Sequence, residues 1–162
     1  MRKLKISNPF WQLVGLGVIA GMRSASAPAI ASHILSHHHS GRFSRSALSF
    51  MQSDKMALLL KVFAVGEFIG DKLPNTPNRI KTAGVAFRCL TGSLAGASIY
   101  KVSGNNAITG ALLGSVAALG ATYGSYFLRK EIVSSTHIFD PIIGAIEDAL
   151  VIGAGIGLVE TV

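Results

Sequence analysis

The sequence predicts an all-α fold, a polytopic membrane helix bundle of about five spans, from three observations. Of the 162 residues, 49 % are hydrophobic and only 14 % are charged, whereas an average soluble domain is roughly 25 % charged. The charged residues cluster between apolar runs of about twenty residues, which is the pattern of transmembrane helices. The 18 Gly, with many Ala and Ser, suit close helix packing in lipid. We therefore expect residues 1–162 to form a single integral membrane domain.

The first predicted span is interrupted. An apolar run over residues 9–22 resumes over residues 26–35, with Arg23 and Ser24 between the two parts and Pro28 shortly after. Proline lacks a backbone donor and disfavours a helical residue before it, so we expect a broken or kinked helix near Arg23–Pro28. Backbone groups freed by such a break are tolerated at membrane depth only inside protein or beside a wet cavity.

Four further spans follow from the hydrophobic pattern. They are expected at about residues 54–73, 80–102, 107–128 and from 140 to the C-terminus. Polar segments separate them, and the first of these is rich in Pro and Asn, as turns are. Asp140 and Pro141 suit the start of the last helix, as a capping residue and as the first helical residue.

Basic residues predict the orientation, because cytoplasmic segments carry an excess of Lys and Arg. With the N-terminus inside, the inner segments hold eight (Arg2, Lys3, Lys5, Lys72, Arg79, Lys81, Arg129 and Lys130) and the outer segments four (Arg42, Arg45, Lys55 and Lys101). We expect a multi-pass protein of the inner (plasma) membrane with a cytoplasmic N-terminus. The net charge of +7 is thereby explained by Lys and Arg residues that orient the protein in the lipid bilayer, and no nucleic-acid partner is expected.

A short internal similarity admits an inverted two-helix repeat. Gly17 and Gly21 can be aligned with Gly110 and Gly114, and both halves place a Glu in the span that follows. Inverted repeats are common in transporters. The alternative is the chance alignment of two helices that are both rich in Gly and Ala.

Charges inside the spans are the main functional candidates, because an intramembrane ionisable residue is costly unless it is paired or hydrated. They are Arg23, Lys61, Glu67, Asp71, Arg88, Glu147 and Asp148. Counting about 1.5 Å per residue puts Glu67, Arg88 and Glu147 roughly 9 to 12 Å above the inner edge, on three helices. We expect these three to form one charged layer, with Asp148 beside it or turned away and Arg23 nearer the membrane centre.

Other chemistry has little support in the sequence. The one cysteine, Cys89, lies in a predicted span and is expected to be inert, and no P-loop, nucleophile elbow or HExxH motif is present. The three consecutive His residues 37–39 are read as a solvated turn. We therefore expect no enzymatic activity, no cofactor and no metal.

Two motifs resemble a known family. The first is Gly21-Met-Arg23-Ser24 followed by Pro28; the second is Gly66-Glu67-x-x-x-Asp71-Lys72-Leu73-Pro74-x-x-Pro77-x-Arg79. Together with the Gly-rich fourth span they are similar to a family of small bacterial membrane proteins described as a domain of unknown function. The resemblance implies a multi-span membrane domain. It carries over Arg23, Ser24, Pro28, Glu67, Asp71, Lys72, Pro74, Pro77 and Arg79 as signature positions, with no role attached.

Two functions follow from the charged layer. In the first, the protein is a small transporter or channel for an ion or small polar solute, with Arg23 and Ser24 at the helix break and Glu67, Arg88 and Glu147 as the inner wall. A homodimer would supply the interior that five short helices alone do not enclose. In the alternative, the charges are structural ion pairs, and the protein is a non-transporting membrane scaffold or assembly factor.

Overall fold

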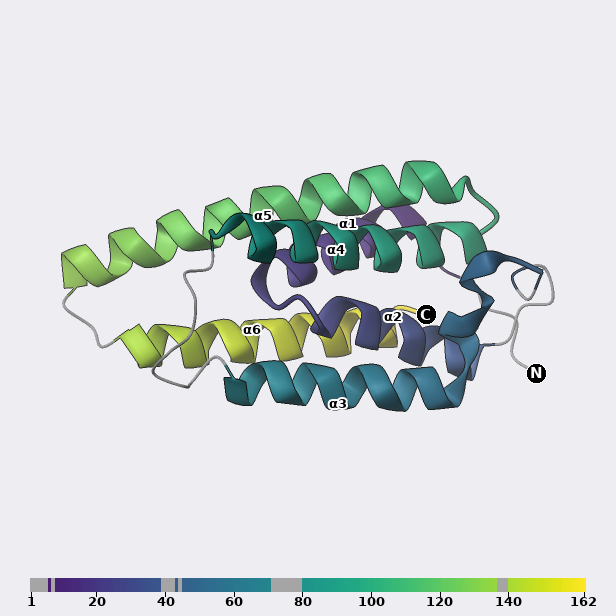
Figure 1. Ribbon diagram of the computed structural model, residues 1–162, viewed down its shortest axis with the longest axis horizontal. Helices are drawn as coiled ribbons and strands as arrows, with labels where there is room; N and C mark the ends of the chain where they lie inside the picture. The colour runs from purple at the N-terminus through teal and green to yellow at the C-terminus, as the bar shows by residue number, and fades with distance from the viewer. Residues whose placement is uncertain (1–5, 7, 39–42, 44, 71–79, 137–139) are drawn as a thin grey trace.

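The structure is a computed structural model that describes residues 6, 8–38, 43, 45–70, 80–136 and 140–162. The described part of the chain is helical: α1 (Pro9–Met22), α2 (Ser26–His37), the short 3-10 helix η1 (Ala47–Gln52), α3 (Asp54–Gly70), α4 (Thr82–Val102), α5 (Ala107–Thr136) and α6 (Asp140–Glu160). The helices lie side by side along one long axis (Figure 1). The all-α prediction is confirmed for these residues.

The two halves of the predicted first span form a hairpin. Gln12, near the start of α1, donates a 3.1 Å hydrogen bond to the carbonyl of Leu158, near the end of α6. Arg23, just after α1, contacts Asp148 in the first half of α6. Helix α1 is therefore antiparallel to α6, and α2 returns from Arg23 toward the end of the bundle at which α1 begins (Figure 1). We call that end the terminal end, because α6 also finishes there.

The hairpin corrects the predicted topology. A kinked span would carry the chain across the bundle, whereas the hairpin returns it to the terminal end before α3 begins. The start of α1 and the end of α6 therefore share one end, together with Arg45 and Lys55, which the predicted topology placed on the far side from the start of α1. The predicted charge difference depended on that separation, so it no longer supports an orientation.

The last helices follow the predicted bounds with one difference. The span predicted to end at Leu128 continues as α5 to Thr136. Arg129, Lys130 and Glu131 end the apolar run, but all three are good helix formers and no Gly or Pro follows them within the helix. The charge cluster therefore marks the end of the apolar run and not the end of the helix.

Glycines allow α4 and α5 to pack closely. A Cβ added to Gly92 would lie 2.7 Å from the carbonyl oxygen of Gly114, and one added to Gly96 would lie 2.5 Å from that of Gly110. Helix α1 packs on α5 in the same way through Gly17. These small-residue motifs mark helix contacts, as their spacing predicts. A Cβ at Gly120 or Gly124 would meet nothing within 4 Å, so that fourth motif marks no contact within the described structure.

The same contacts argue against an inverted repeat. Gly17 of α1 lies against Gly114 and Ala117 of α5, and Gly21 lies one turn further along against Ala121. Residue numbers rise together on the two helices, so α1 and α5 are parallel. Helices related by inverted topology run in opposite directions. The sequence similarity therefore reflects shared small-residue packing and not inverted halves.

We expect Gly92→Leu to destabilise the protein by about 3 kcal/mol, the upper end of the usual range for overpacking, because the opposing backbone of α5 cannot rotate away. The matched control is Gly120→Leu, which adds the same side chain where nothing lies within 4 Å. Thermal unfolding in detergent measures both. Equal unfolding temperatures for the two variants would contradict the close contact of α4 with α5.

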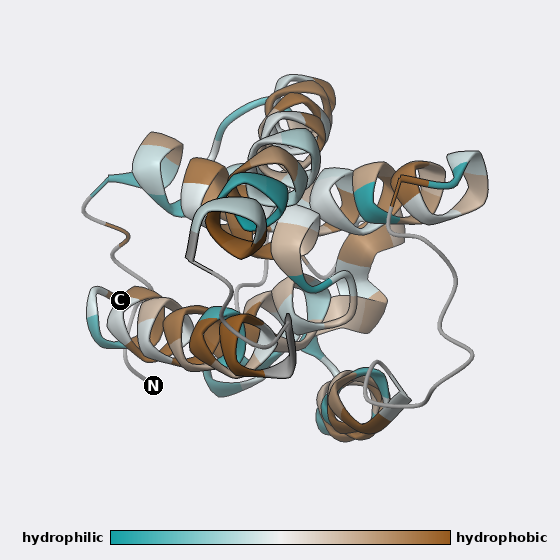
Figure 2. Ribbon diagram, turned by 90° about the vertical axis from the view of Figure 1, so that its left-hand side faces the viewer, coloured by the Kyte–Doolittle hydropathy of each residue, from teal (hydrophilic) through white to brown (hydrophobic). Residues whose placement is uncertain are grey.

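The surface of the bundle is apolar. Two helical segments, Ala107–Ser135 and Ile142–Glu160, are long and apolar enough to cross a membrane, and only 22 % of the tested window in each is buried in the molecule. Ile108, Val116 and Ile69 are among many large apolar side chains that are more than 60 % exposed. Figure 2 shows that hydrophobic residues predominate over hydrophilic ones along the helices of the bundle. Monomeric soluble proteins rarely expose such continuous apolar surface.

Candidate functional site

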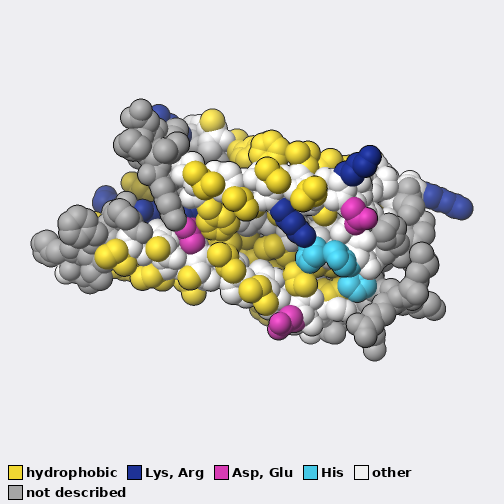
Figure 3. Space-filling model, turned by 90° about the horizontal axis from the view of Figure 1, so that it is seen from below, with side chains coloured by type: hydrophobic (Ala, Val, Ile, Leu, Met, Phe, Trp, Pro, Cys, Tyr) yellow, Lys and Arg dark blue, Asp and Glu magenta, His cyan; other side chains and the backbone are white. Residues whose placement is uncertain are grey.

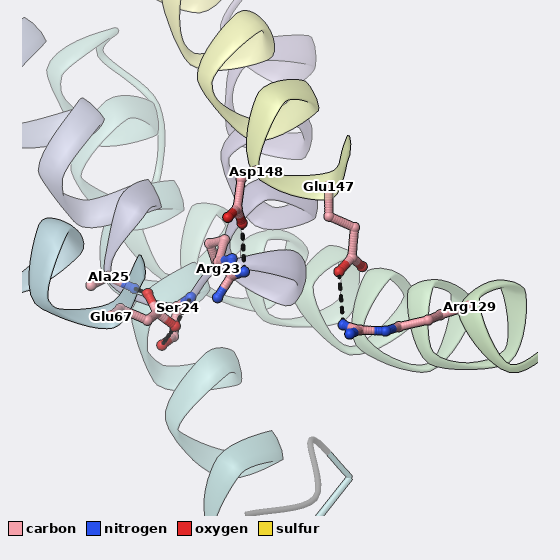
Figure 4. Close-up of polar contacts among 7 residues, drawn as sticks. All are labelled: Arg23, Ser24, Ala25, Glu67, Arg129, Glu147 and Asp148. Atoms are coloured by element: carbon pink, nitrogen blue, oxygen red, sulfur yellow. Dashed lines mark hydrogen bonds and ion pairs between the residues drawn. The ribbon is translucent and has the colours of Figure 1, made fainter. Parts of the chain in front are cut away.

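The start of α2 binds the carboxylate of Glu67. Helix α2 begins at Ser26, and the first backbone N–H groups of a helix have no partner inside it. Glu67, near the end of α3, accepts hydrogen bonds from the backbone N–H groups of Ser24 (2.8 Å) and Ala25 (2.7 Å). The Ser24 hydroxyl donates a third, at 2.5 Å (Figure 4). A side chain from another helix therefore caps α2, where the helix dipole also favours a negative charge.

Arg23 forms a buried ion pair at the same turn. Its Nη2 lies 2.5 Å from Oδ1 of Asp148 on α6, and the two side chains are 3 % and 13 % exposed. The guanidinium carbon also lies 5.2 Å from the centre of the Phe68 ring, on the helix that supplies Glu67. Arg23, Ser24, Glu67 and Asp148 thus tie the hairpin to α3 and α6, and we call these four residues the tip cluster.

A second ion pair lies beside the tip cluster. Glu147, adjacent to Asp148 in sequence, has Oε2 3.4 Å from Nη1 of Arg129 on α5 (Figure 4). Both side chains are largely buried, at 10 % and 20 % exposure. The neighbouring carboxylates of α6 therefore point to different helices, one toward the hairpin and one toward the second half of α5.

Arg88 lies on α4 at a similar height in the bundle. It is 8 % exposed. Gly92, one turn later, packs against Gly114 and Ala118 of the antiparallel helix α5, which places Arg88 near the level of Thr122. The Thr122 hydroxyl lies 3.2 Å from the carbonyl oxygen of Gly21, just before the tip. Arg88 is therefore close in height to the hairpin tip.

The structure changes the composition of the predicted charged layer. The expected group was Glu67, Arg88 and Glu147, with Arg23 set apart. In the structure Arg23 lies at the height of Glu67, because adjacent Ser24 binds Glu67, and its partner is Asp148. The sequence count measured Arg23 from the start of α1 and Glu67 from the end of α3, and the hairpin puts these two helix ends at opposite ends of the bundle.

Five signature positions lie outside the described residues: Asp71, Lys72, Pro74, Pro77 and Arg79. Pro28 is in the first turn of α2, where the missing N–H would have had no helical partner in any case. It therefore suits the second helix of the hairpin.

Three participants were missed by sequence reasoning. Arg129 was assigned to a loop because the apolar run ends before it; the absence of a helix breaker after it was the available signal. Phe68 carries no signal beyond its proximity to Glu67. The backbone N–H of Ala25 is invisible to any search by residue type.

The tip cluster offers both donors and acceptors of hydrogen bonds at one place. Two N–H groups, a hydroxyl and a guanidinium can bind oxygen atoms or an anion, and two carboxylates can bind a cation or a proton. No group of three His, Cys, Asp or Glu side chains suited to a metal ion occurs in the part of the chain that the structure describes.

Fold and site together define a helical bundle with two helices able to cross a membrane and a polar, charged helix hairpin at its centre. Residues 11–160 match the family described as a domain of unknown function (DUF4126), and the chain belongs to that family. This confirms the resemblance seen in the sequence. No curated protein and no solved structure matches the chain.

Proposed function

We propose that the protein is a multi-pass membrane protein in which α3 to α6 cross the bilayer and the α1–α2 hairpin enters it from the terminal end. Helices α4 and α6 have 21 residues each, or about 31 Å, which matches a hydrocarbon core of about 30 Å. Helices α1 and α2, with 14 and 12 residues, reach only about 20 Å. This arrangement has four membrane crossings instead of the five spans that the sequence predicts. The start of α1 and the end of α6 then face the same side of the membrane.

The exposed side chains support this placement. Large apolar residues cover the outward faces of α3, α5 and α6, and Trp11, 67 % exposed, lies near the start of α1. Trp is enriched where a membrane meets water, and the start of α1 is at such a boundary in the proposed arrangement.

Within that membrane, we propose that the protein moves an ion or a small polar solute past the tip cluster. The observation that carries this proposal is the position of the tip cluster. Asp148 is eight residues after the start of α6 and twelve before its end, or roughly 12 and 18 Å. Polar and charged groups that are gathered near mid-membrane by a hairpin are costly, and such groups commonly mark substrate or ion paths.

The contacts suggest how such a site would work. Glu67 occupies three donors that point to one place, and it reaches them from a different helix. If the carboxylate swings away, or takes a cation or proton, the donors at the start of α2 become available to an oxygen-bearing solute or an anion. Glu67 and the passing species would then bind these donors in turn, while Asp148 holds Arg23 in place.

Flux through liposomes that contain the purified protein tests this proposal. Reporter dyes for protons, Na⁺, K⁺ and Cl⁻ and the release of trapped small polar solutes cover the chemical classes that the tip cluster admits. Movement of at least one species faster than in protein-free liposomes is expected. If none of them moves faster, the transport proposal is wrong.

A second candidate is a membrane scaffold whose charges fix helix register. It is favoured by the pairing itself, because Arg23 with Asp148 and Arg129 with Glu147 are direct ion pairs. A scaffold requires the contacts and not the charges, so it tolerates their replacement by well-packed apolar side chains. The tolerance of the charged pairs to apolar replacement therefore separates the two candidates.

A further inference from the structure

An open groove of about 590 Å³ lies between α2, α3 and α6. Its walls are apolar and include Ile30, Val65 and Ile156. Figure 3 views this face and shows hydrophobic side chains in the hollow, with Lys or Arg and His side chains gathered next to it. The volume falls within the range of about 300 to 1,000 Å³ that is usual for small-molecule sites.

The groove has a charged end and an apolar end. Ile30 of α2 lies against Gly155 of α6, and His33, about one turn later, comes to the height of Glu160. Phe68, in contact with Arg23, lines the groove at the other end, near the hairpin tip. Seven residues of α3 separate Lys61 from Phe68, or about 10 Å. In the proposed membrane placement, the groove runs from the terminal end most of the way to mid-membrane, since one leaflet of the hydrocarbon core is about 15 Å deep.

The charged end carries both signs. Lys61 Nζ lies 3.0 Å from Nδ1 of His33, a distance at which the ammonium donates to a neutral imidazole. An ammonium group has three donors, so two remain for another acceptor. Glu160, in the last turn of α6, lines the same end of the groove and is exposed. The lining of this end of the groove therefore includes an ammonium from α3 and a carboxylate from α6, with apolar walls behind them.

We propose that this groove binds one zwitterionic phospholipid with a primary amine in its headgroup, such as a phosphatidylethanolamine. An acyl chain occupies the apolar walls, the phosphate accepts hydrogen bonds from Lys61, and the amine pairs with Glu160. The headgroup of an anionic lipid has no cation to pair with the Glu160 carboxylate. A choline headgroup has a cation but no N–H to donate. The inference depends on the proposed membrane placement and is independent of transport.

Native mass spectrometry of the intact protein, released from bilayers of equal parts phosphatidylethanolamine, phosphatidylcholine and phosphatidylglycerol, tests the proposal. We expect one phosphatidylethanolamine to stay bound. Lys61→Met keeps the apolar stem and removes a charge-assisted hydrogen bond, so retention should fall about tenfold. Lys55→Met, on the same helix outside the groove, should retain the lipid. Glu160→Gln should remove the preference for an amine over choline.

Three results would overturn the proposal. The first is a groove filled by phosphatidylglycerol in preference to phosphatidylethanolamine. The second is a second copy of the chain on this face, seen as a dimer that excludes lipid and is lost in Lys61→Met. The third is equal retention by the Lys61 and Lys55 variants. Membrane fractionation of the same samples distinguishes a failure of lipid binding from a failure of the membrane placement. Protein that is embedded in membranes but retains no lipid contradicts only the proposal that the groove binds a phospholipid.

Discussion

Glu67→Gln is expected to reduce flux to the level of protein-free liposomes while the protein stays folded. The amide keeps one carbonyl oxygen, which can accept from Ser24 or Ala25, so the start of α2 remains partly capped. It loses the negative charge and the second acceptor, so it can neither take up a proton nor pair with a cation. Glu67→Ala removes both oxygens and should also lower the free energy of unfolding by about 2 kcal/mol, as the loss of a helix cap does.

The matched control is Glu131→Gln, the same change at an exposed position on α5. It should leave both flux and unfolding unchanged. Unchanged flux in Glu67→Gln, with the control behaving normally, would remove Glu67 from the path. A loss of flux in both variants would point to a general effect of charge on the assay.

The second large effect is expected at the Arg23–Asp148 pair. Arg23→Met should lower the free energy of unfolding by about 3 to 5 kcal/mol, because it leaves Asp148 buried without its cation. Asp148→Leu alone should also lower the free energy of unfolding, because it removes the carboxylate that pairs with the buried guanidinium. The double variant Arg23→Met with Asp148→Leu should regain most of that stability, since replacement of a buried pair by apolar groups of similar size is often neutral or stabilising.

This double variant separates the two candidate functions. Thermal unfolding shows whether the fold is regained, and liposome flux shows whether a transport path survives. Transport predicts a stable protein without flux. A scaffold predicts a stable protein that still supports its host and still holds its partner. A double variant as unstable as Arg23→Met would contradict the direct pairing of Arg23 with Asp148.

Much of the helical fold could be predicted from the sequence, because helix positions follow from the spacing of apolar runs and turn residues. The break at Arg23 was visible in the same way, through Ser24 and Pro28. What the break does to the chain direction was not visible, because a kinked span and a hairpin leave the same local sequence. The direction depends on contacts distant in sequence, such as that of Gln12 with Leu158.

The charged residues of the site could be predicted from the sequence, but the residues with which they pair could not. Arg23, Glu67, Glu147 and Asp148 were all selected because charges in apolar segments are rare. Their pairing depends on the height of each residue in the bundle, and the hairpin brings Arg23 to the height of Glu67 and Asp148. Neighbouring carboxylates such as Glu147 and Asp148 also point about 100° apart on a helix, so they reach different partners.

A hairpin tip past which an ion or solute moves must be a wet, polar site inside the membrane. Water-soluble thiol reagents test it directly at Ala25→Cys in a background of Cys89→Ala, with the protein in sealed liposomes. Ala25 is partly exposed, and its backbone N–H contact with Glu67 does not depend on its side chain. Leu112→Cys, on an exposed apolar face of α5, is the lipid-facing control, and Asn105→Cys, in the exposed turn between α4 and α5, is the aqueous control.

We expect the reagent to modify Ala25→Cys at a rate near that of Asn105→Cys, and to leave Leu112→Cys unmodified. Modification of Ala25→Cys should also slow in the presence of the transported species. A cysteine at position 25 as unreactive as the one at position 112 would show a dry helix contact. The tip cluster would then lock the bundle and conduct nothing.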